Sequence, residues 1–292
     1  MTRSFTFLVN PLAGGGAAPG AVVPVSRLLR DAGAAVEVTY SPGPQAMAEL
    51  AAAAVDHGDV VVSVGGDGML ASLAGHVAAL GGTLGIVPAG RGNDFARMLG
   101  LPSEPEAVAR VLLEREPRAV DLIDAGTRWV AGSVYAGVDA RAAELVDRMH
   151  RVPRPLQYPL AAVRALATYR PTRVHVTVDG VESAYDAALV VVANSAYYGS
   201  GMRIAPPADV EDGLLDVVVV AAASRTALIR ALPSVYDGAH IERDEVTVLR
   251  GSSVRLWAES PVACGADGEP LDTLGREPLD LAVRPGALRV LA

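Results

Sequence analysis

The sequence predicts two domains, an α/β domain with a parallel sheet followed by a β-sandwich. A chain of 292 residues is comfortable for two domains. Strand and helix patterns alternate at the start of the chain, and the remainder shows many short strands separated by turn signals. The expected boundaries are 1–120 for the α/β domain, 121–275 for the β-sandwich, and 276–292 for a terminal segment that could return to the first domain.

The first domain is predicted from alternation of the two hydrophobic periods. Helices are expected at 21–31, 45–57 and 69–80, and strands at 5–9, 36–39, 60–64 and 84–87. A series of βαβ units implies parallel strands with helices on the faces of the sheet. Ligands of such sheets bind beyond the carboxyl ends of the strands.

The second domain is predicted from short strands and the turns between them. Strands are expected at 128–136, 173–178, 187–193, 214–220, 246–249 and 254–258, with a turn at Asp179-Gly180. Helices are expected at 139–150 and 156–169, separated by a proline-containing loop at 151–155. The last strands, 279–283 and 288–291, could close either domain.

Composition excludes several classes of protein. All 25 positive residues are arginine, so a P-loop lysine, a protein-kinase strand lysine and a Schiff base are excluded. A net charge of -8 argues against general nucleic-acid binding. No apolar run is long enough to span a bilayer, and the amino terminus lacks the apolar stretch of a signal peptide. We therefore expect a cytoplasmic protein.

The side chains of cysteine and histidine carry no recognisable chemistry. The single cysteine, Cys264, is expected to be a small buried side chain rather than a reactive thiol. None of the five histidines has metal-ligand spacing, so they are expected at the surface or in the core.

Three glycine-bearing segments fall at the carboxyl ends of the expected strands. Gly65-Gly-Asp67-Gly68 follows an apolar strand, and bare backbone there lets N–H groups approach a phosphate while Asp67 suits a divalent metal. The other segments are 10–16 and 88–94, in which Asn93 or Asp94 can cap the next helix and present its positive end to an anion. An ordinary turn or a simple capped helix is the alternative for each segment. Together they indicate an enzyme that uses a nucleotide.

Six ordered motifs give a resemblance to a known family. They are Asn10-Pro-Leu-Ala-Gly14, Gly65-Gly-Asp-Gly68, Gly90-Arg-Gly-Asn-Asp-Phe-Ala-Arg97, the segment 194–201 with Met202, Pro206 and Ala208, Asp212-Gly-Leu-Leu-Asp216, and Asp267-Gly-Glu269. The chain resembles the diacylglycerol kinase catalytic-domain family, in particular the bacterial lipid kinases related to sphingosine kinases and, more distantly, NAD kinases. The resemblance implies an amino-terminal nucleotide domain, a β-sandwich lipid domain and an active site in the cleft between them.

The resemblance also implies roles for individual residues. Asp67 would organise the ATP phosphates and catalytic Mg²⁺, Ser41 would contact the nucleotide, and Glu269, with Asp267 close behind, would supply the base that activates a lipid hydroxyl. The full set expected to bind the nucleotide is Asn10, Gly14, Ser41, Gly65, Gly66, Asp67, Gly68, Met69, Gly90, Arg91, Asn93 and Asp94.

A structural Mg²⁺ site is implied at Asp209, Asp212 and Leu214, with a metal-free turn as the alternative.

The chain departs from the family at Met69 and Arg91, where the family usually has threonine. A hydroxyl at position 69 would give a phosphate hydrogen bond worth about 1.5 to 3 kcal/mol. Arg91 could compensate, because a guanidinium binds phosphate through two parallel hydrogen bonds.

The expected function is ATP-dependent, Mg²⁺-requiring phosphorylation of a lipid hydroxyl, on diacylglycerol or a related lipid. The alternatives are NAD-kinase-like phosphorylation of a soluble nucleotide, and a catalytically silent protein that binds a nucleotide or lipid. Seven arginines against two acidic residues between Arg141 and Arg173 favour contact with the inner membrane surface, although a solvated helix face would explain them too. We expect a monomer or homodimer.

Overall fold

The computed structural model describes residues 3–11, 13–40, 43–90, 92–146, 149 and 152–292. The chain forms two compact units. The first comprises residues 1–122 and 284–292, and the second comprises residues 123–283. An α/β domain followed by a β-sandwich-like domain is the predicted fold class, and it is confirmed.

The first unit is built on a parallel sheet in the order β15-β4-β3-β1-β2. Its elements are β1 (Ser4–Val9), η1 (Ala13–Gly15), α1 (Ala18–Asp31), β2 (Ala35–Tyr40), α2 (Pro44–His57), β3 (Val60–Gly65), α3 (Asp67–Ala79), β4 (Thr83–Pro88), α4 (Asp94–Met98), α5 (Pro105–Glu114), β5 (Pro117–Asp124) and the end of β15 (Leu279–Leu291). Strand β3 is buried along its whole length, as its near-continuous valine sequence requires for a strand covered on both faces.

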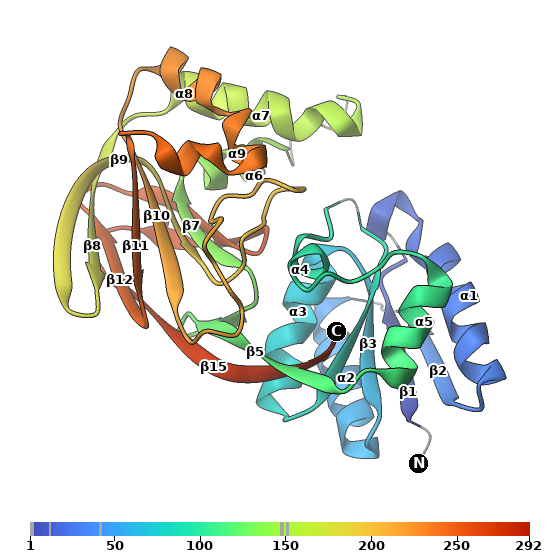
Figure 1. The fold of residues 1–292 in the computed structure, drawn as a ribbon. Coiled ribbons are helices and arrows are strands. Elements are labelled where there is room, and N and C mark those ends of the chain that lie inside the picture. The colour runs from blue at the N-terminus through green and yellow to red at the C-terminus, as the bar shows by residue number, and fades with distance from the viewer. Residues whose placement is uncertain (1–2, 12, 41–42, 91, 147–148, 150–151) are drawn as a thin grey trace. The chain divides into compact units, whose positions relative to one another are not determined.

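Helices cover both faces of this sheet. Helices α1 and α5 pack together on one face, and α2 and α3 pack together on the other (Figure 1). The core below α1 and α5 includes Phe5 and Phe7 of β1, Leu29 of α1 and Leu112 of α5, all at most 1% exposed. The sheet therefore holds the loops at the carboxyl ends of β1, β3 and β4 on a rigid base.

The second unit is an antiparallel assembly in which β9 pairs with β7, β8 and β10. Its elements are β6 (Trp129–Val130), β7 (Ser133–Gly137), α6 (Val138–Val146), α7 (Arg154–Thr168), β8 (Thr172–Val178), β9 (Val181–Ala193), β10 (Leu215–Ala221), α8 (Arg225–Ala231), α9 (Ser234–Asp237), η2 (Ala239–Glu242), β11 (Val246–Gly251), β12 (Ser253–Ala258), β13 (Val262–Ala266) and β14 (Glu269–Leu274). Small and branched aliphatic side chains of these strands form one core, which includes Cys264 at 5% exposure, so the expected burial of that thiol is confirmed.

The turn predicted at Asp179-Gly180 is confirmed. Val178 pairs with Val181, and the two turn residues have φ values of 46° and 85°, as a two-residue hairpin turn requires. Ser252 and Ser253 donate their backbone N–H groups to the Asp179 carboxylate. The hairpin is thus joined to the start of β12.

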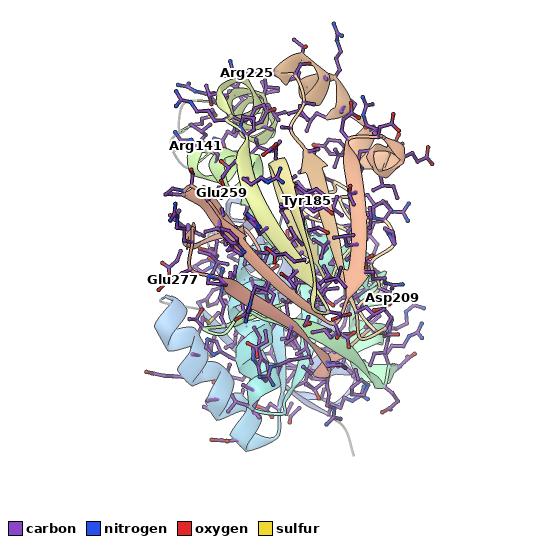
Figure 2. The ribbon with its side chains drawn as sticks, turned by 90° about the vertical axis from the view of Figure 1, so that its left-hand side faces the viewer. Arg141, Tyr185, Asp209, Arg225, Glu259 and Glu277 are labelled. Atoms are coloured by element: carbon purple, nitrogen blue, oxygen red, sulfur yellow. The ribbon has the colours of Figure 1, made fainter. Side chains whose placement is uncertain are left out.

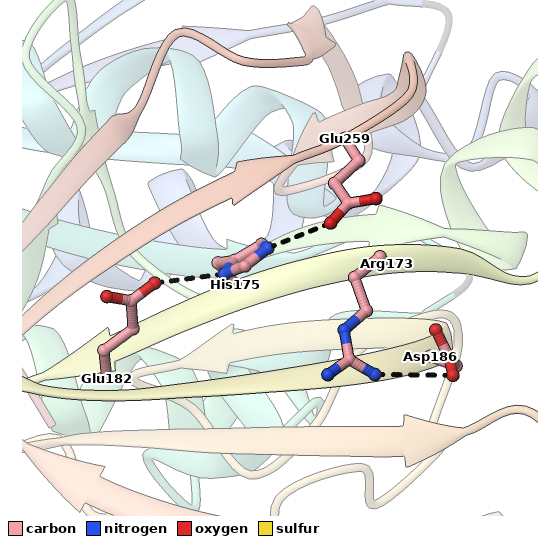
Figure 3. A network of polar contacts seen from close by, with 5 residues as sticks. All are labelled: Arg173, His175, Glu182, Asp186 and Glu259. Carbon is pink, nitrogen blue, oxygen red and sulfur yellow. Dashed lines mark hydrogen bonds and ion pairs between the residues drawn. The ribbon is translucent and has the colours of Figure 1, made fainter.

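One face of the β8-β9-β12 sheet carries polar side chains. The His175 ring stacks on Trp257, with centroids 3.6 Å apart, and its two nitrogens lie 3.0 Å from Glu182 and 3.5 Å from Glu259 (Figure 3). On the same pair of strands, β8 and β9, Arg173 forms an ion pair with Asp186 at 3.4 Å. His175 is therefore a sheet-surface residue, in keeping with the absence of metal-ligand spacing.

Several element boundaries differ from the expectations. The strand expected at 128–136 is interrupted at Ala131 and Gly132, and helix α5 with strand β5 lies in a stretch for which no element was predicted. The two strands expected at 279–283 and 288–291 are one continuous strand, which pairs with β12 in the second unit and with β4 in the first. Among the described residues, no helix is long and apolar enough to cross a membrane.

Candidate active site

The first candidate region is the turn from β3 into α3. Strand β3 ends at Gly65, Gly66 is the residue before the helix, and Asp67 is the first helical residue. A Cβ atom on Gly65 would lie 2.8 Å from the Cβ of Met69, so only glycine allows the first helical turn to pack this closely on the strand. The expected position of Asp67 at a strand's carboxyl end is confirmed by these boundaries.

Two glycine loops meet here through their backbones. A Cβ atom on Gly90 would lie 2.3 Å from the Cα of Gly66, and one on Gly66 would lie 3.0 Å from the Cα of Gly90. The N–H of Ala89 also donates to the Gly65 carbonyl at 2.8 Å. The loops after β3 and β4 therefore form one unit, which any side chain at either contact would force apart.

Asn93 shapes the second loop. It adopts the left-handed conformation, with φ 51° and ψ 44°, which asparagine tolerates better than most residues. Its side-chain oxygen accepts the Gly90 N–H at 2.9 Å, and its side-chain nitrogen donates to the Gly90 carbonyl at 3.1 Å. This closed ring of contacts positions the backbone of the loop.

Asp67 connects the two loops. Its carboxylate accepts the backbone N–H of Asp94 at 2.6 Å, at the start of α4. Burial raises the pKa of Asp67, and the N–H groups of Asp94, Phe95 and Asn93 partly offset this effect. Asp94 is itself 6% exposed. The Asp67 carboxylate thus lies beside the start of α4 and the glycine loops. From the sequence, this proximity was expected only because the loops follow neighbouring strands of a parallel sheet.

Strand β1 supplies a third loop. The Asn10 N–H donates to the Val64 carbonyl at 3.2 Å, and the Asn10 carbonyl accepts the Ala13 N–H at 3.1 Å. Gly14 lies in the short η1 helix that follows. Gly68 is exposed in the first turn of α3, whereas Met69 is only 6% exposed and packs against Gly65. Ser41 and Arg91 lie outside the described residues.

The second unit has two acidic residues at the hairpin of β13 and β14. Asp267 has φ 50° and Gly268 has φ 87°, so the pair forms the turn between β13 and β14. Ala131 donates its N–H to one Asp267 oxygen at 2.8 Å, and Gly132 and Ser133 donate theirs to the other at 2.9 and 3.0 Å. Glu269 begins β14 and is exposed. The Asp267 carboxylate is thus held by backbone N–H groups, whereas the Glu269 carboxylate is open to solvent.

The proposed structural metal loop has an arginine beside it. Asp209 accepts the N–H of Glu211 at 3.1 Å, and Asp212 accepts the N–H of Leu214 at 2.9 Å. Asp212 also forms an ion pair with Arg250, whose guanidinium lies 3.7 Å from Asp216. Among the described residues, no three histidine, cysteine or acidic side chains form a metal cluster. The Arg250 guanidinium thus lies at one Asp212 oxygen, and the other oxygen accepts the Leu214 N–H.

The second unit contains a pocket, and two of its lining residues, Tyr198 and Met202, belong to the motif at 194–202. Its lining is mainly aliphatic and comes from α7, α8, β9, β10 and the segment 198–204. The few polar groups include Asp139, which accepts a hydrogen bond from the Tyr198 hydroxyl, and His240, whose Nε2 lies 3.0 Å from the Ile204 carbonyl. Burial raises the pKa of Asp139 to about 6. Tyr198 lies 59 positions from Asp139, so no local pattern could reveal the pair.

Comparisons with known proteins cover both units. Residues 4–125 match the model of the diacylglycerol kinase catalytic domain, and residues 132–292 match that of the YegS C-terminal NAD kinase beta sandwich-like domain. A diacylglycerol kinase from Mycobacterium tuberculosis is 35% identical over 98% of this chain and 94% of its own length. The chain belongs to the diacylglycerol kinase catalytic-domain family. The expected family is therefore confirmed.

Other family members agree in sequence and fold. A probable lipid kinase, YegS-like, from Chromohalobacter salexigens is 30% identical over 90% of this chain and 86% of its own length. The crystal structure of a diacylglycerol kinase from Bacillus anthracis shares the fold, with a TM-score of 0.73 and 19% identity over 99% of this chain and 96% of the other. Membership in this lipid kinase family implies use of ATP.

Proposed function

We propose that this protein transfers the γ-phosphoryl group of ATP to the hydroxyl of diacylglycerol or a closely related lipid. The observation that carries the proposal is the joined pair of glycine loops, with the Asp67 carboxylate beside them at the carboxyl edge of the parallel sheet. Phosphoryl transfer needs little covalent chemistry from the protein, because positioning and charge stabilisation supply most of the catalysis. Glycine-rich loops held on a rigid sheet can position the phosphates in this way.

The nucleotide would be held by the first unit. Close packing of Gly66 against Gly90, which a Cβ atom at either position would prevent, fixes the backbone of the two loops. Glycine backbone of this kind can approach phosphates closely. We propose that Asn10, Gly14, Gly68, Asn93 and Asp94 complete this site, with Ser41, Met69 and Arg91 near the nucleotide. Asp67 fits Mg²⁺, a hard cation that takes oxygen ligands and would neutralise charge on the phosphates.

The acceptor would be held by the second unit. The aliphatic pocket between α7, α8 and the sheet suits an acyl chain, and Asp139 with Tyr198 offers polar contacts to a glycerol head group. Burying each methylene there is worth about 0.8 kcal/mol before entropic costs. A soluble nucleotide such as NAD would gain nothing from this lining, so the pocket favours a lipid over the NAD-kinase-like alternative.

The base would come from the turn between β13 and β14. We propose that Glu269 accepts the proton of the lipid hydroxyl, because its carboxylate is exposed and therefore open to a substrate. Both oxygens of Asp267 accept backbone N–H groups, so we propose that Asp267 holds the turn that presents Glu269. The loop with Asp209, Asp212 and Leu214 takes no part in the proposed reaction.

A kinase assay tests the proposal. Purified protein is incubated with labelled ATP and Mg²⁺, and phosphate is measured in dioctanoylglycerol dispersed in detergent and in NAD. We expect label in the lipid, with Asp67→Asn and Glu269→Gln each lowering the rate by about 100-fold, since charge organisation and base assistance are lost. Asp272→Asn is the matched control, because Asp272 is exposed on the same strand as Glu269.

Three results would contradict the proposal. Label in NAD alone would support the alternative of a soluble-nucleotide kinase. Label in neither acceptor, with ATP binding intact by calorimetry, would support the catalytically silent alternative. Rates equal to the wild type in both Asp67→Asn and Glu269→Gln would overturn the roles assigned to these two carboxylates.

A further inference from the structure

Two tyrosine rings connect the aliphatic pocket of the second unit to the turn that carries Glu269. Tyr135 is the middle residue of β7 and is 5% exposed, and Tyr198 lines the pocket. Their ring centroids are 6.0 Å apart and their planes are inclined by 56°, a tilted arrangement that aromatic pairs favour. The rings therefore join the proposed acyl site to the proposed base.

At the pocket end, the position of Tyr198 is set from two sides. Its hydroxyl donates a hydrogen bond to Asp139 in the first turn of α6, and both residues line the pocket. Its backbone exchanges two hydrogen bonds of 3.0 Å with Met202, another lining residue, which is 2% exposed. A ligand that fills the pocket therefore lies against a tyrosine of defined orientation.

At the other end, Tyr135 packs against the strand that leads into the turn. It pairs with Gly265 of β13, and a Cβ atom on Gly265 would lie 2.7 Å from the tyrosine Cε2 and 2.9 Å from its hydroxyl oxygen. Burial and the charge of Asp139 raise the pKa of Tyr135, and a hydrogen bond from the backbone of Gly268 partly offsets this rise. Tyr135 therefore keeps its proton at neutral pH and contacts the residue that directly precedes Glu269.

The two residues of the turn are thus held from one stretch of chain. The backbone N–H groups of residues 131–133 hold the carboxylate of Asp267, and Tyr135, two positions further on, contacts Gly268. Glu269 follows these two residues directly. Its direction therefore depends on how firmly the backbone of Asp267 and Gly268 is held.

We propose that Tyr135 and Tyr198 are positioning residues for Glu269, and that they couple occupancy of the aliphatic pocket to the turn between β13 and β14. Chains of packed side chains and hydrogen bonds carry coupling between neighbouring sites. A lipid in the pocket confines the Tyr198 ring, which confines Tyr135 and, through Gly268, the base. This inference rests on the proposed function, because it takes Glu269 as the base and the pocket as the lipid site.

Removal of each hydroxyl tests the positioning role by kinetics. Tyr135→Phe and Tyr198→Phe keep the rings and remove one hydrogen bond each. We expect each variant to lower kcat for dioctanoylglycerol in detergent by about 10-fold, with KM for ATP within about twofold of wild type. The matched control is Tyr185→Phe, because Tyr185 is a half-buried tyrosine of β9 that packs on the core of the same unit (Figure 2). This variant should keep the wild-type kcat, and urea midpoints check that each variant is folded.

A double-variant cycle separates positioning from a merely structural role. If Tyr135 acts through Glu269, the effect of Tyr135→Phe disappears once Glu269→Gln has removed the base. The double variant should then have a kcat within about twofold of that of Glu269→Gln alone. A further loss of about 10-fold in the double variant would show that the two residues act independently, and would overturn the positioning role.

Hydrogen exchange tests the coupling without catalysis. The wild-type protein is incubated with dioctanoylglycerol in detergent, without ATP. We expect the lipid to slow amide exchange by at least about twofold both in α7 and α8, which line the pocket, and in residues 266–270. In Tyr198→Phe, protection of the helices should remain and protection of the turn should be lost. Protection of the helices alone in the wild type, or equal protection of the turn in both proteins, would overturn the coupling.

The two readouts separate this inference from the proposed function. If the wild type phosphorylates no lipid, the proposed function fails, and hydrogen exchange still decides whether the pocket and the turn are coupled. If the wild type phosphorylates the lipid while Tyr135→Phe and Tyr198→Phe behave as Tyr185→Phe does, the proposed function stands and the positioning role fails. Protection of neither region by the lipid would overturn both the acyl site and the coupling.

Discussion

Gly90 is the residue at which the candidate nucleotide site tolerates least change. A methyl group there would meet the Cα of Gly66 at 2.3 Å and the side-chain oxygen of Asn93 at 2.8 Å. Backbone cannot move aside as a flexible side chain can, so the two loops must separate. We expect Gly90→Ala to weaken ATP binding by at least about 10-fold and to lower the free energy of unfolding by about 1 to 3 kcal/mol.

Calorimetric titration with ATP and unfolding in urea measure these two effects. Gly20→Ala in helix α1 is the control, because its added methyl group would have no atom within 4 Å. Alanine favours a helix over glycine, so this variant should gain about 0.5 to 1 kcal/mol of stability without a change in ATP binding. Unchanged nucleotide affinity in Gly90→Ala would show that the paired loops do not hold the nucleotide.

At the scale of elements, the turn between β13 and β14 depends on one carboxylate. Asp267 accepts three backbone N–H groups, and asparagine at this position would turn an N–H donor toward at least one of those donors. We expect Asp267→Asn to cost about 1 to 3 kcal/mol of unfolding free energy. If the turn positions Glu269, kcat should also fall while KM for ATP stays constant.

The hairpin between β8 and β9 offers a matched control. Asp179 also has a positive φ, precedes a glycine in a two-residue turn, and accepts N–H groups from a neighbouring loop. Asp179→Asn should therefore lower stability without a selective loss of kcat. Urea unfolding and steady-state kinetics compare the two variants. Parallel changes in kcat for both would indicate that Asp267 is a structural residue only.

The same elements show what a sequence can and cannot predict. Periodicity and the Asp179-Gly180 turn depend on neighbours in the chain, so β1, β3, β8 and that turn were predicted close to their observed positions. Strand β9 was expected at 187–193 but begins at Val181. The break in the strand expected at 128–136 was missed, because Gly132 is held by Asp267, which lies 135 positions away. The glycine loops were predicted, but the contact between Gly66 and Gly90 was not, because it depends on tertiary packing.

At the scale of the whole molecule, the chain returns to its first unit at the end. Residues 284–292 belong to the first unit, where β15 pairs in parallel with β4 through Arg289 and Val290. The family match for the first domain spans only residues 4–125, so it omits this strand. Pairing of β15 with β4 closes a long loop of chain, and closing a long loop slows folding. Once the pair has formed, β15 is part of the buried core of the first unit.

This closure makes Leu291 a test of how the first unit is held together. Leu291 is 0% exposed in the core that contains Phe5 and Leu112. We expect Leu291→Ala to lower the free energy of unfolding by about 2 to 5 kcal/mol, from lost burial and the cavity that remains. Leu80→Ala is the control, since Leu80 is 44% exposed in the same unit and should cost less than about 1 kcal/mol.

Urea unfolding measures the loss, and hydrogen exchange locates it. Amide protection in β1, β3 and β4 should fall more than protection in β8 and β9, because the cavity lies in the first unit. ATP should restore part of the stability, because a ligand that binds only the folded state stabilises it by mass action. Equal loss of protection in both units would mean that the strand shared by them, β15, couples their unfolding into a single transition.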